Sequence, residues 1–83
     1  MINELRGKID NIDNQIIELL DERFDVAKAI GEEKKKNNIQ VLDSKREQVI
    51  LDKVDSKASK EHAEYIKQIY IKIMEESKEY QNK

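Results

Sequence analysis

The chain contains no cysteine, no proline and no tryptophan, and it has two glycines among 83 residues. Without cysteine there is no disulfide framework, no thiol nucleophile and no thiolate metal site. His62 is the one histidine in the sequence, so a histidine-based metal centre is poorly supported and we expect no metal site. Because proline and glycine interrupt helices most strongly, their scarcity favours long helices.

The chain also lacks a strong excess of charge of either sign and any long apolar run. Its formal net charge is −2, and the basic residues are dispersed among acidic ones, which gives no electrostatic footprint for nucleic acid. No apolar run approaches membrane-spanning length, and the N-terminus lacks the apolar core of a secretory signal. We therefore expect a cytoplasmic protein that binds neither nucleic acid nor membrane.

Charged residues make up 41% of the chain, but regularly spaced aliphatic residues indicate a folded protein and not a disordered one. The chain is too short for two hydrophobic cores, and a single core of this size would be marginal. We therefore expect one domain over residues 1–83.

Residues 3–36 are expected to form one unbroken helix. Apolar residues recur there at alternating steps of three and four, which lines up a single stripe. The stripe consists of Ile2, Leu5, Ile9, Ile12, Ile16, Leu19, Val26 and Ile30. Its position between Leu19 and Val26 is occupied by Arg23. A long cation at an apolar position is either an edge residue whose head reaches water or half of a binding site.

The length of this helix predicts an oligomer. A helix over residues 3–36 would be about 50 Å long, whereas a globule of 83 residues spans about 30 Å. The helix should therefore project beyond its own domain, and its apolar stripe would need cover from another chain. An obligate two-fold homodimer, in which the long helices pack against one another, is the simplest solution.

The first helix should end near Asn37 and Asn38, which tolerate the left-handed conformation that stops helices. After a short connector, a second helix should begin at about Ser44. Its first turn is capped either by an S-x-x-E capping box of Ser44 and Glu47 or by Asp43.

The polar residues 55–59 should end the second helix, and Ser59 could cap a third helix. The apolar side of that third helix is carried by Ala63, Ile66, Tyr70, Ile73 and Met74. The same series continues into Ser77 and Gln81. We therefore predict an all-α fold of one long, one short and one medium helix, closed into an intertwined helical bundle by a second copy.

Arg23 and Lys34 are the first candidates for chemistry. They lie eleven residues apart, which is three helical turns, so they share one face of the first helix. Ala27 and Ile30 lie between them and could form a shallow apolar floor. Taken singly, each cation also has a structural explanation, as an edge residue for the arginine and as a solvated partner of the helix dipole for the lysine.

Arg6 lies seventeen residues before Arg23, about 25 Å away along a helix, and so cannot join that site within its own chain. An antiparallel partner helix crossing near Ile16 and Ile17 could bring the partner's Arg6 close to Arg23. A solvated arginine in the first turns is the alternative.

Asp43, Arg46 and Glu47 cluster at the start of the second helix, where a cap and a charged first turn explain them sufficiently. Ser77 and Gln81, one turn apart, lie at positions that the apolar phase assigns to the core. They are either wet at a fraying C-terminus or directed into a polar cavity. These patterns indicate a helical dimer with a cationic pocket for a small anion, but they name no reaction.

Three fragments of the chain carry a more specific signal when taken in order. They are LRGKID with IDNQIIELLDERFDVAKAIGEEK, then VLDSKREQVI, and finally YIKQIYIKIMEESKEYQ. In order and spacing they resemble the L-R-x-x-I-D, L-L-x-x-R, G-x-x-K, D-x-x-R-E and S-x-x-x-Q motifs of the all-helical chorismate mutases. The resemblance covers nearly the whole chain and implies that family's intertwined three-helix dimer.

The resemblance also implies an activity, the intramolecular rearrangement of chorismate to prephenate in aromatic amino-acid biosynthesis, with no cofactor. Arg23 and Arg6 of the partner subunit would hold the two carboxylates of chorismate. Lys34 would donate to the ether oxygen and a carboxylate, and Gln81 would donate to the same ether oxygen from the opposite side.

By the same resemblance, residues of the second and third helices would complete the substrate site. Glu47 and the backbone around Asp43 would hold the ring hydroxyl. Arg46 would support the carboxylate side, and Ser77 would touch the ring carboxylate.

Two other functions remain open. An isochorismate pyruvate-lyase of the same fold would use a similar cationic pocket, and a non-catalytic helical dimerisation or regulatory module would not need Arg23, Lys34 or Gln81. The chain could also dock onto another enzyme of aromatic biosynthesis.

Overall fold

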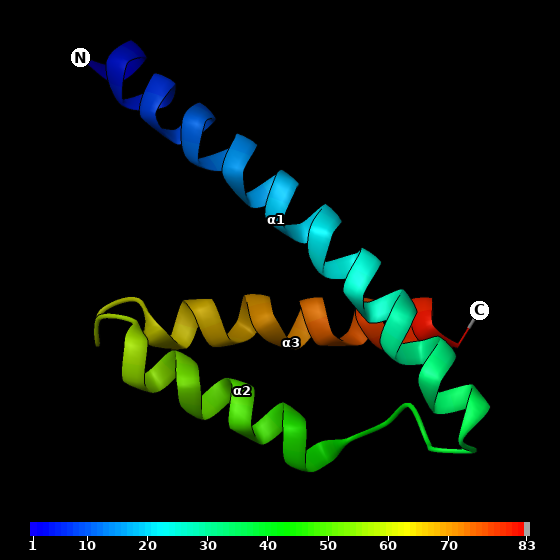
Figure 1. The fold of residues 1–83 in the computed structure, drawn as a ribbon. Helices are drawn as coiled ribbons and strands as arrows, with labels where there is room; N and C mark the ends of the chain where they lie inside the picture. Colours follow the sequence, from blue (N-terminus) through cyan, green and yellow to red (C-terminus); the bar gives the residue numbers. More distant parts are fainter. Residues whose placement is uncertain (83) are drawn as a thin grey trace.

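The computed structural model describes residues 1–82, which form three α-helices and no strand. The helices are α1 (Ile2–Lys36), α2 (Ser44–Lys57) and α3 (Ala63–Gln81). Figure 1 shows α2 and α3 as an antiparallel hairpin, with the C-terminal half of α1 crossing α3 and its N-terminal half extending away. The predicted all-α fold of one long, one short and one medium helix is confirmed.

Small residues allow α1 and α3 to approach closely where they cross. Ala27 and Gly31, one turn apart on α1, are both buried. A Cβ atom added at Gly31 would lie 3.1 Å from the Cβ of Gln81 on α3, so a side chain there would press α3 away. Phe24 and Tyr80 pack edge-to-face beside this contact, with ring centroids 5.4 Å apart.

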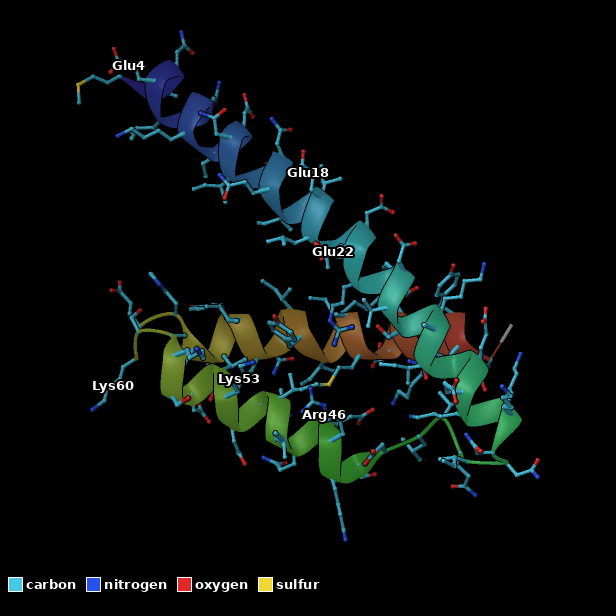
Figure 2. The ribbon with its side chains drawn as sticks, in the orientation of Figure 1. Glu4, Glu18, Glu22, Arg46, Lys53 and Lys60 are labelled. Carbon is cyan, nitrogen blue, oxygen red and sulfur yellow. The ribbon has the colours of Figure 1, made fainter. Side chains whose placement is uncertain are left out.

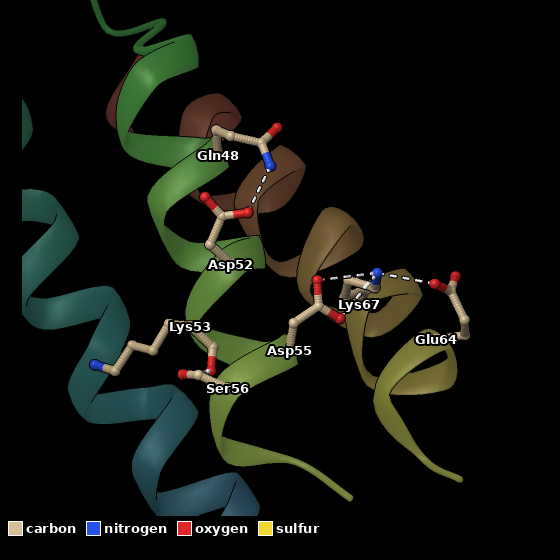
Figure 3. Close-up of polar contacts among 7 residues, drawn as sticks. All are labelled: Gln48, Asp52, Lys53, Asp55, Ser56, Glu64 and Lys67. Atoms are coloured by element: carbon tan, nitrogen blue, oxygen red, sulfur yellow. Dashed lines mark hydrogen bonds and ion pairs between the residues drawn. The ribbon is translucent and has the colours of Figure 1, made fainter. Parts of the chain in front are cut away.

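The α2–α3 hairpin is fastened by a buried apolar contact region and a surface ion network. Val54 and Ala63 are buried within the hairpin. Lys67 of α3 lies 3.1 Å from Asp55 of α2 and 2.8 Å from Glu64 of its own helix (Figure 3). The hydrogen bonds that Lys67 donates to Glu64 and, to a lesser extent, to Asp55 raise the pKa of Lys67. In the described part of the chain α1 and α2 do not pack against each other directly, so α3 links them.

The end of the first helix agrees with the sequence, but the cap of α2 is one of two alternatives that the sequence left open. Asn38 has a φ of 54°, the left-handed conformation expected after the first helix. The N-cap of α2 is Asp43, whose carboxylate accepts a hydrogen bond of 3.0 Å from the backbone N–H of Arg46. The predicted Ser44–Glu47 capping box is therefore wrong, because Ser44 already lies inside the helix and the Glu47 carboxylate turns towards α3.

The predicted Ser59 cap of the third helix is also wrong. Residues 60–62 form a turn, and α3 begins at Ala63. It is the backbone carbonyl of Ser59 that accepts hydrogen bonds, from the N–H groups of His62 and Ala63. The third helix begins later than expected because residues 60–62 reverse the chain between two antiparallel helices.

The N-terminal half of α1 leaves its apolar stripe uncovered. Its stripe residues from Ile2 to Leu19 are between 46% and 65% exposed. Glu4 and Glu18, labelled in Figure 2, lie on this half, which extends away from α2 and α3. The molecule extends 54 Å along its longest axis, so the prediction that the helix projects beyond its domain is confirmed.

The single chain is less compact than a globule of its size. Its radius of gyration is 15.5 Å, compared with about 12 Å expected for 83 residues. Its accessible surface is 7204 Å², compared with about 5,200 Å² for a compact protein of this mass. Within residues 1–82, the buried hydrophobic side chains are Ala27, Val54, Ala63 and Met74. No helix in this range is both long and apolar enough to cross a membrane.

Candidate active site

A cleft of about 270 Å³ opens where the C-terminal half of α1, the start of α2 and the end of α3 meet. Its polar lining consists of Arg23, Lys34, Asp43, Arg46, Glu47, Ser77, Lys78 and Gln81. Its apolar lining consists of Val26, Ala27, Ile30, Val41, Ile50 and Met74. Every residue that the sequence singled out for substrate binding lies in this lining except Arg6.

Arg23 is anchored to α3 at one side of the cleft. Its Nη1 donates a hydrogen bond of 2.7 Å to Ser77 Oγ. Ser77 is 8% exposed, so the end of α3 is not frayed there and the hydroxyl is directed at the cleft. A guanidinium has five N–H donors in a planar fork, so Arg23 keeps donors for an anion after binding Ser77.

Lys34 stands at the other end of the same helix face, with Ala27 and Ile30 in the lining between it and Arg23. The connector folds back over it, because the N–H of Ile39 donates to the Lys34 carbonyl at 2.8 Å. The Lys34 ammonium in turn donates to the Val41 carbonyl at 3.1 Å. An ammonium has three N–H donors, so Lys34 is held in place by Val41 and keeps two donors for a ligand in the cleft.

Gln81 reaches the cleft because Gly31 lets α3 approach α1. Its Oε1 is buried and has no hydrogen-bond partner among the described residues. A buried acceptor atom without a partner needs an explanation, and a donor on a ligand in the cleft would supply one. The amide could donate from Nε2 or accept at Oε1, according to its rotation.

The first turn of α2 supplies three charged side chains to the cleft, namely Asp43, Arg46 and Glu47. Arg46 is labelled on this turn in Figure 2. The capping role expected for Asp43 is present, and its side chain also lines the cleft. Glu47 Oε2 forms an ion pair of 3.0 Å with the Nζ of Lys78 on α3.

Lys78 is a lining residue that was not expected at the site from the sequence. It directly follows Ser77 and precedes Gln81 by three residues, which places it on the Gln81 side of α3. That spacing was available in the sequence. Its pairing with Glu47 was not, because the two residues are 31 positions apart on different helices.

Arg6 is exposed on the projecting half of α1 and does not line the cleft. It lies seventeen residues before Arg23, about 25 Å along the helix. One chain therefore does not bring Arg6 to the site, in agreement with the expectation that it cannot join Arg23 within its own helix.

The cleft is suited to a small anion with an apolar body. Among its lining residues the cations Arg23, Lys34, Arg46 and Lys78 outnumber the carboxylates Asp43 and Glu47. Fixed N–H donors surround an apolar floor, an arrangement that binds and polarises an anionic ligand through charge-assisted hydrogen bonds. Among residues 1–82, no group of three or more histidine, aspartate or glutamate side chains could hold a metal ion.

The fold and cleft define an all-α protein with a cleft in which cations outnumber carboxylates. Residues 5–82 match the model of the family described as chorismate mutase type II, and the chain belongs to this family. The resemblance stated from the sequence motifs is thereby confirmed.

Individual relatives agree with this family. A protein named chorismate mutase from Methanocaldococcus jannaschii is 44% identical over 59 residues, covering 71% of this chain and 59% of the relative. A bifunctional chorismate mutase/prephenate dehydratase from Aquifex aeolicus is 45% identical over 53 residues, covering 64% of this chain and 15% of the relative.

A second bifunctional chorismate mutase/prephenate dehydratase, from Buchnera aphidicola, is 38% identical over 80 residues, covering 94% of this chain and 21% of the relative. The chain thus spans 59% or less of the length of each of these relatives. No solved structure matches the chain.

Proposed function

We propose that this chain is a chorismate mutase, which converts chorismate to prephenate. The observation that carries the proposal is the convergence of Arg23, Lys34 and Gln81, from two helices, on one cleft with an apolar floor. Membership of the chorismate mutase type II family and the name of the Methanocaldococcus jannaschii relative support it.

The chemistry explains why such residues suffice. The rearrangement breaks an ether C–O bond while a C–C bond forms within the same molecule. It needs no proton transfer, no nucleophile and no cofactor. Catalysis reduces to two tasks, which are selecting the compact reactive conformer and stabilising the negative charge that grows on the ether oxygen.

Arg23 and Lys34 would divide these tasks between them. Arg23, held by Ser77, would clamp one substrate carboxylate through its remaining N–H groups. Lys34, held by the Val41 carbonyl, would donate to the ether oxygen and to a carboxylate. Gln81 would donate from its amide nitrogen to the same ether oxygen from the other side of the cleft.

The remaining lining residues would fix the ring. Glu47 and the backbone near Asp43 would hold the ring hydroxyl, and Arg46 would support the carboxylate side. Ser77 would touch the ring carboxylate while it orients Arg23.

We further propose that the active form is an intertwined homodimer. The surface of one chain exceeds that of a compact protein of its size by about 2,000 Å², enough for an obligate interface. Between α1 and the α2–α3 hairpin lies a groove of about 400 Å³, lined by apolar Val49, Ile50, Val54, Ile66 and Tyr70 and by cations including Arg23. The projecting half of the partner's α1 would fill this groove. The single domain over residues 1–83 would then take its core from two copies.

This arrangement supplies the missing arginine. Two antiparallel α1 helices crossing near Ile16 and Ile17 would bring Arg6 of the partner subunit towards Arg23. A dianion would then be held by guanidinium groups from both chains.

The direct test of the activity is the fall in chorismate absorbance when purified protein is added, with isochorismate as the parallel substrate. Conversion of chorismate to prephenate supports the proposal. Release of pyruvate from isochorismate alone would assign the chain to the lyase reaction. No turnover of either substrate would leave a non-catalytic helical module.

The contribution of Arg6 in trans can be tested by mixing two inactive variants. Arg6→Ala and Arg23→Ala homodimers should each be inactive, since each lacks one arginine in both sites. After exchange of subunits at equal concentrations, half the dimers are hybrids with one intact site, which restores about a quarter of the wild-type activity. No recovery on mixing, despite demonstrated exchange, would refute the shared site.

Docking onto another enzyme of aromatic biosynthesis stays a prediction. It is supported by the names of the two bifunctional relatives, which join chorismate mutase to prephenate dehydratase in one chain. A prephenate-consuming enzyme is accordingly the partner class to test, by sedimentation of the two purified proteins together.

A further inference from the structure

The ion pair between Glu47 and Lys78 closes one side of the cleft. Glu47 Oε2 and Lys78 Nζ lie 3.0 Å apart, and their side chains are 27% and 33% exposed. The pair joins the first turn of α2 to the last turns of α3. Within residues 1–82, Lys78 is the one charged group paired with the Glu47 carboxylate.

We propose that Lys78 is a positioning residue that holds Glu47 ready to accept a hydrogen bond from a hydroxyl on the substrate ring. The inference rests on the proposed function and concerns a residue outside the family motifs matched above. Lys78 binds Oε2, which leaves Oε1 of the same carboxylate to accept from the ligand. A glutamate held by one oxygen loses less rotamer freedom when the substrate binds.

Lys78 also keeps Glu47 away from the substrate-binding cations. Arg23 and Arg46 line the same cleft, and an unpaired carboxylate beside them would compete with the carboxylates of the substrate. Pairing with Lys78 satisfies Glu47 and leaves the guanidinium groups available to the ligand.

The geometry distinguishes Lys78 from an ordinary surface lysine. Lys72, on the same helix, pairs with Glu75 and Glu76 one turn ahead of it. Lys78 instead reaches across to α2, although Glu75 lies three residues before it on α3. A partly exposed ion pair adds little to folding stability, and the hairpin already has the Lys67 network. Its consequence should therefore appear in substrate binding.

The first experiment is steady-state kinetics of Lys78→Met with chorismate. The ring hydroxyl lies next to the ether carbon but its own bonds neither break nor form, so we expect its contact to be about equally strong in the ground state and the transition state. Loss of such uniform binding raises KM by about fivefold and leaves kcat within about twofold of wild type. Lys78→Arg should retain the wild-type KM, and Lys72→Met is the matched control that should change neither constant.

The second experiment repeats Lys78→Met in a Glu47→Gln background, with thermal unfolding recorded for every variant. If Lys78 acts through Glu47, its effect on KM disappears in that background. An unchanged KM in the single variant would overturn the inference. So would an equal effect in the Glu47→Gln background, or a loss of kcat that follows a fall in Tm. A wild-type protein without chorismate turnover would overturn the proposed function itself, which is a separate and earlier result.

Discussion

The two halves of α1 carry one apolar stripe, and the C-terminal half in addition packs small residues beside the stripe against α3. In the N-terminal half the stripe residues are isoleucine and leucine, and from Ile2 to Leu19 they are 46% to 65% exposed. In the C-terminal half, Ala27 and Gly31 are buried against α3. Small residues let a helix of the same chain approach and enclose a cleft, whereas large aliphatic residues left uncovered offer a surface to a partner from outside the chain.

Arg23 lies where the two halves meet. It occupies a stripe position, and it lines both the cleft and the groove beside the projecting half. Its anchor, Ser77, lies on α3, which packs against the C-terminal half of α1, here called the packed half. Arg6 lies on the projecting N-terminal half, here called the free half. The comparison predicts that the packed half governs catalysis within one chain and that the free half governs it through assembly, which would bring Arg6 of the partner subunit to the site.

The largest expected effect is the loss of Lys34 from the packed half. Lys34→Ala removes the donor assigned to the ether oxygen, and one preorganised donor of this kind is worth about 100- to 1000-fold in kcat. The variant should keep the molar mass of the wild-type assembly in light scattering. Lys36→Ala, an exposed lysine two residues later, is the control and should stay near wild type. Activity of Lys34→Ala within tenfold of wild type would contradict the role.

The second effect tests the free half. Ile16→Glu places a carboxylate in the stripe near the expected crossing point, and each dimer would bury two of them. The dissociation constant Kd of the dimer should rise by at least about a hundredfold, as measured by sedimentation over a dilution series. Asn14→Glu introduces the same charge on the opposite face of α1 and should leave Kd near wild type. Equal behaviour of the two variants would break the comparison between stripe and polar face.

Gln81→Glu gives a smaller, pH-dependent effect in the packed half. A glutamine amide donates hydrogen bonds at any ordinary pH, whereas a glutamate must be protonated to donate. We expect kcat to fall by at least about tenfold near neutrality and to recover as the pH becomes acidic. The pH–rate profile decides the point, because a profile that matches wild type near neutrality would remove Gln81 from the mechanism.

The smallest effect compares the same substitution in both halves. Gly7 has no atom within 4 Å of an added Cβ, so Gly7→Ala should stabilise the protein by about 1 kcal/mol through helix propensity alone. At Gly31 the added Cβ would meet Gln81 at 3.1 Å, which requires α3 to shift. That strain offsets the propensity gain by about 1–3 kcal/mol.

Thermal unfolding and kcat together check this pair. Gly31→Ala should unfold at a lower temperature than Gly7→Ala and should lose activity through displacement of Gln81. Equal stabilisation by both substitutions would show that the α1–α3 approach is not tight at Gly31.

The sequence could predict α1 almost completely, because its evidence is local and periodic. The spacing of apolar residues predicts the helix and its projecting stripe, and the asparagines after Lys36 mark its end. The same geometry places Arg23 and Lys34 on one face, since eleven residues make three turns. The ordered motifs indicated the family because their spacing encodes which helix faces meet.

Other features were decided by choices that one local pattern leaves open. Asp43 and Ser44 are both acceptable N-cap residues by type. In the structure the connector ends at Asp43, whose carboxylate accepts from the Arg46 N–H, and Ser44 lies inside α2. Ser59 is followed by a turn and not directly by a helix, because the chain must reverse between α2 and α3.

What the sequence determined by itself is therefore the set of helices, the uncovered stripe and the cations that share a helix face. These features follow from the 3.6-residue period, which acts within one helix. Only the tertiary structure decided that Ser77 binds Arg23, that the Val41 carbonyl holds Lys34 and that Lys78 pairs with Glu47. Each of these contacts joins different segments, and the contact between Arg23 and Ser77 depends on how closely Ala27 and Gly31 let α3 approach α1.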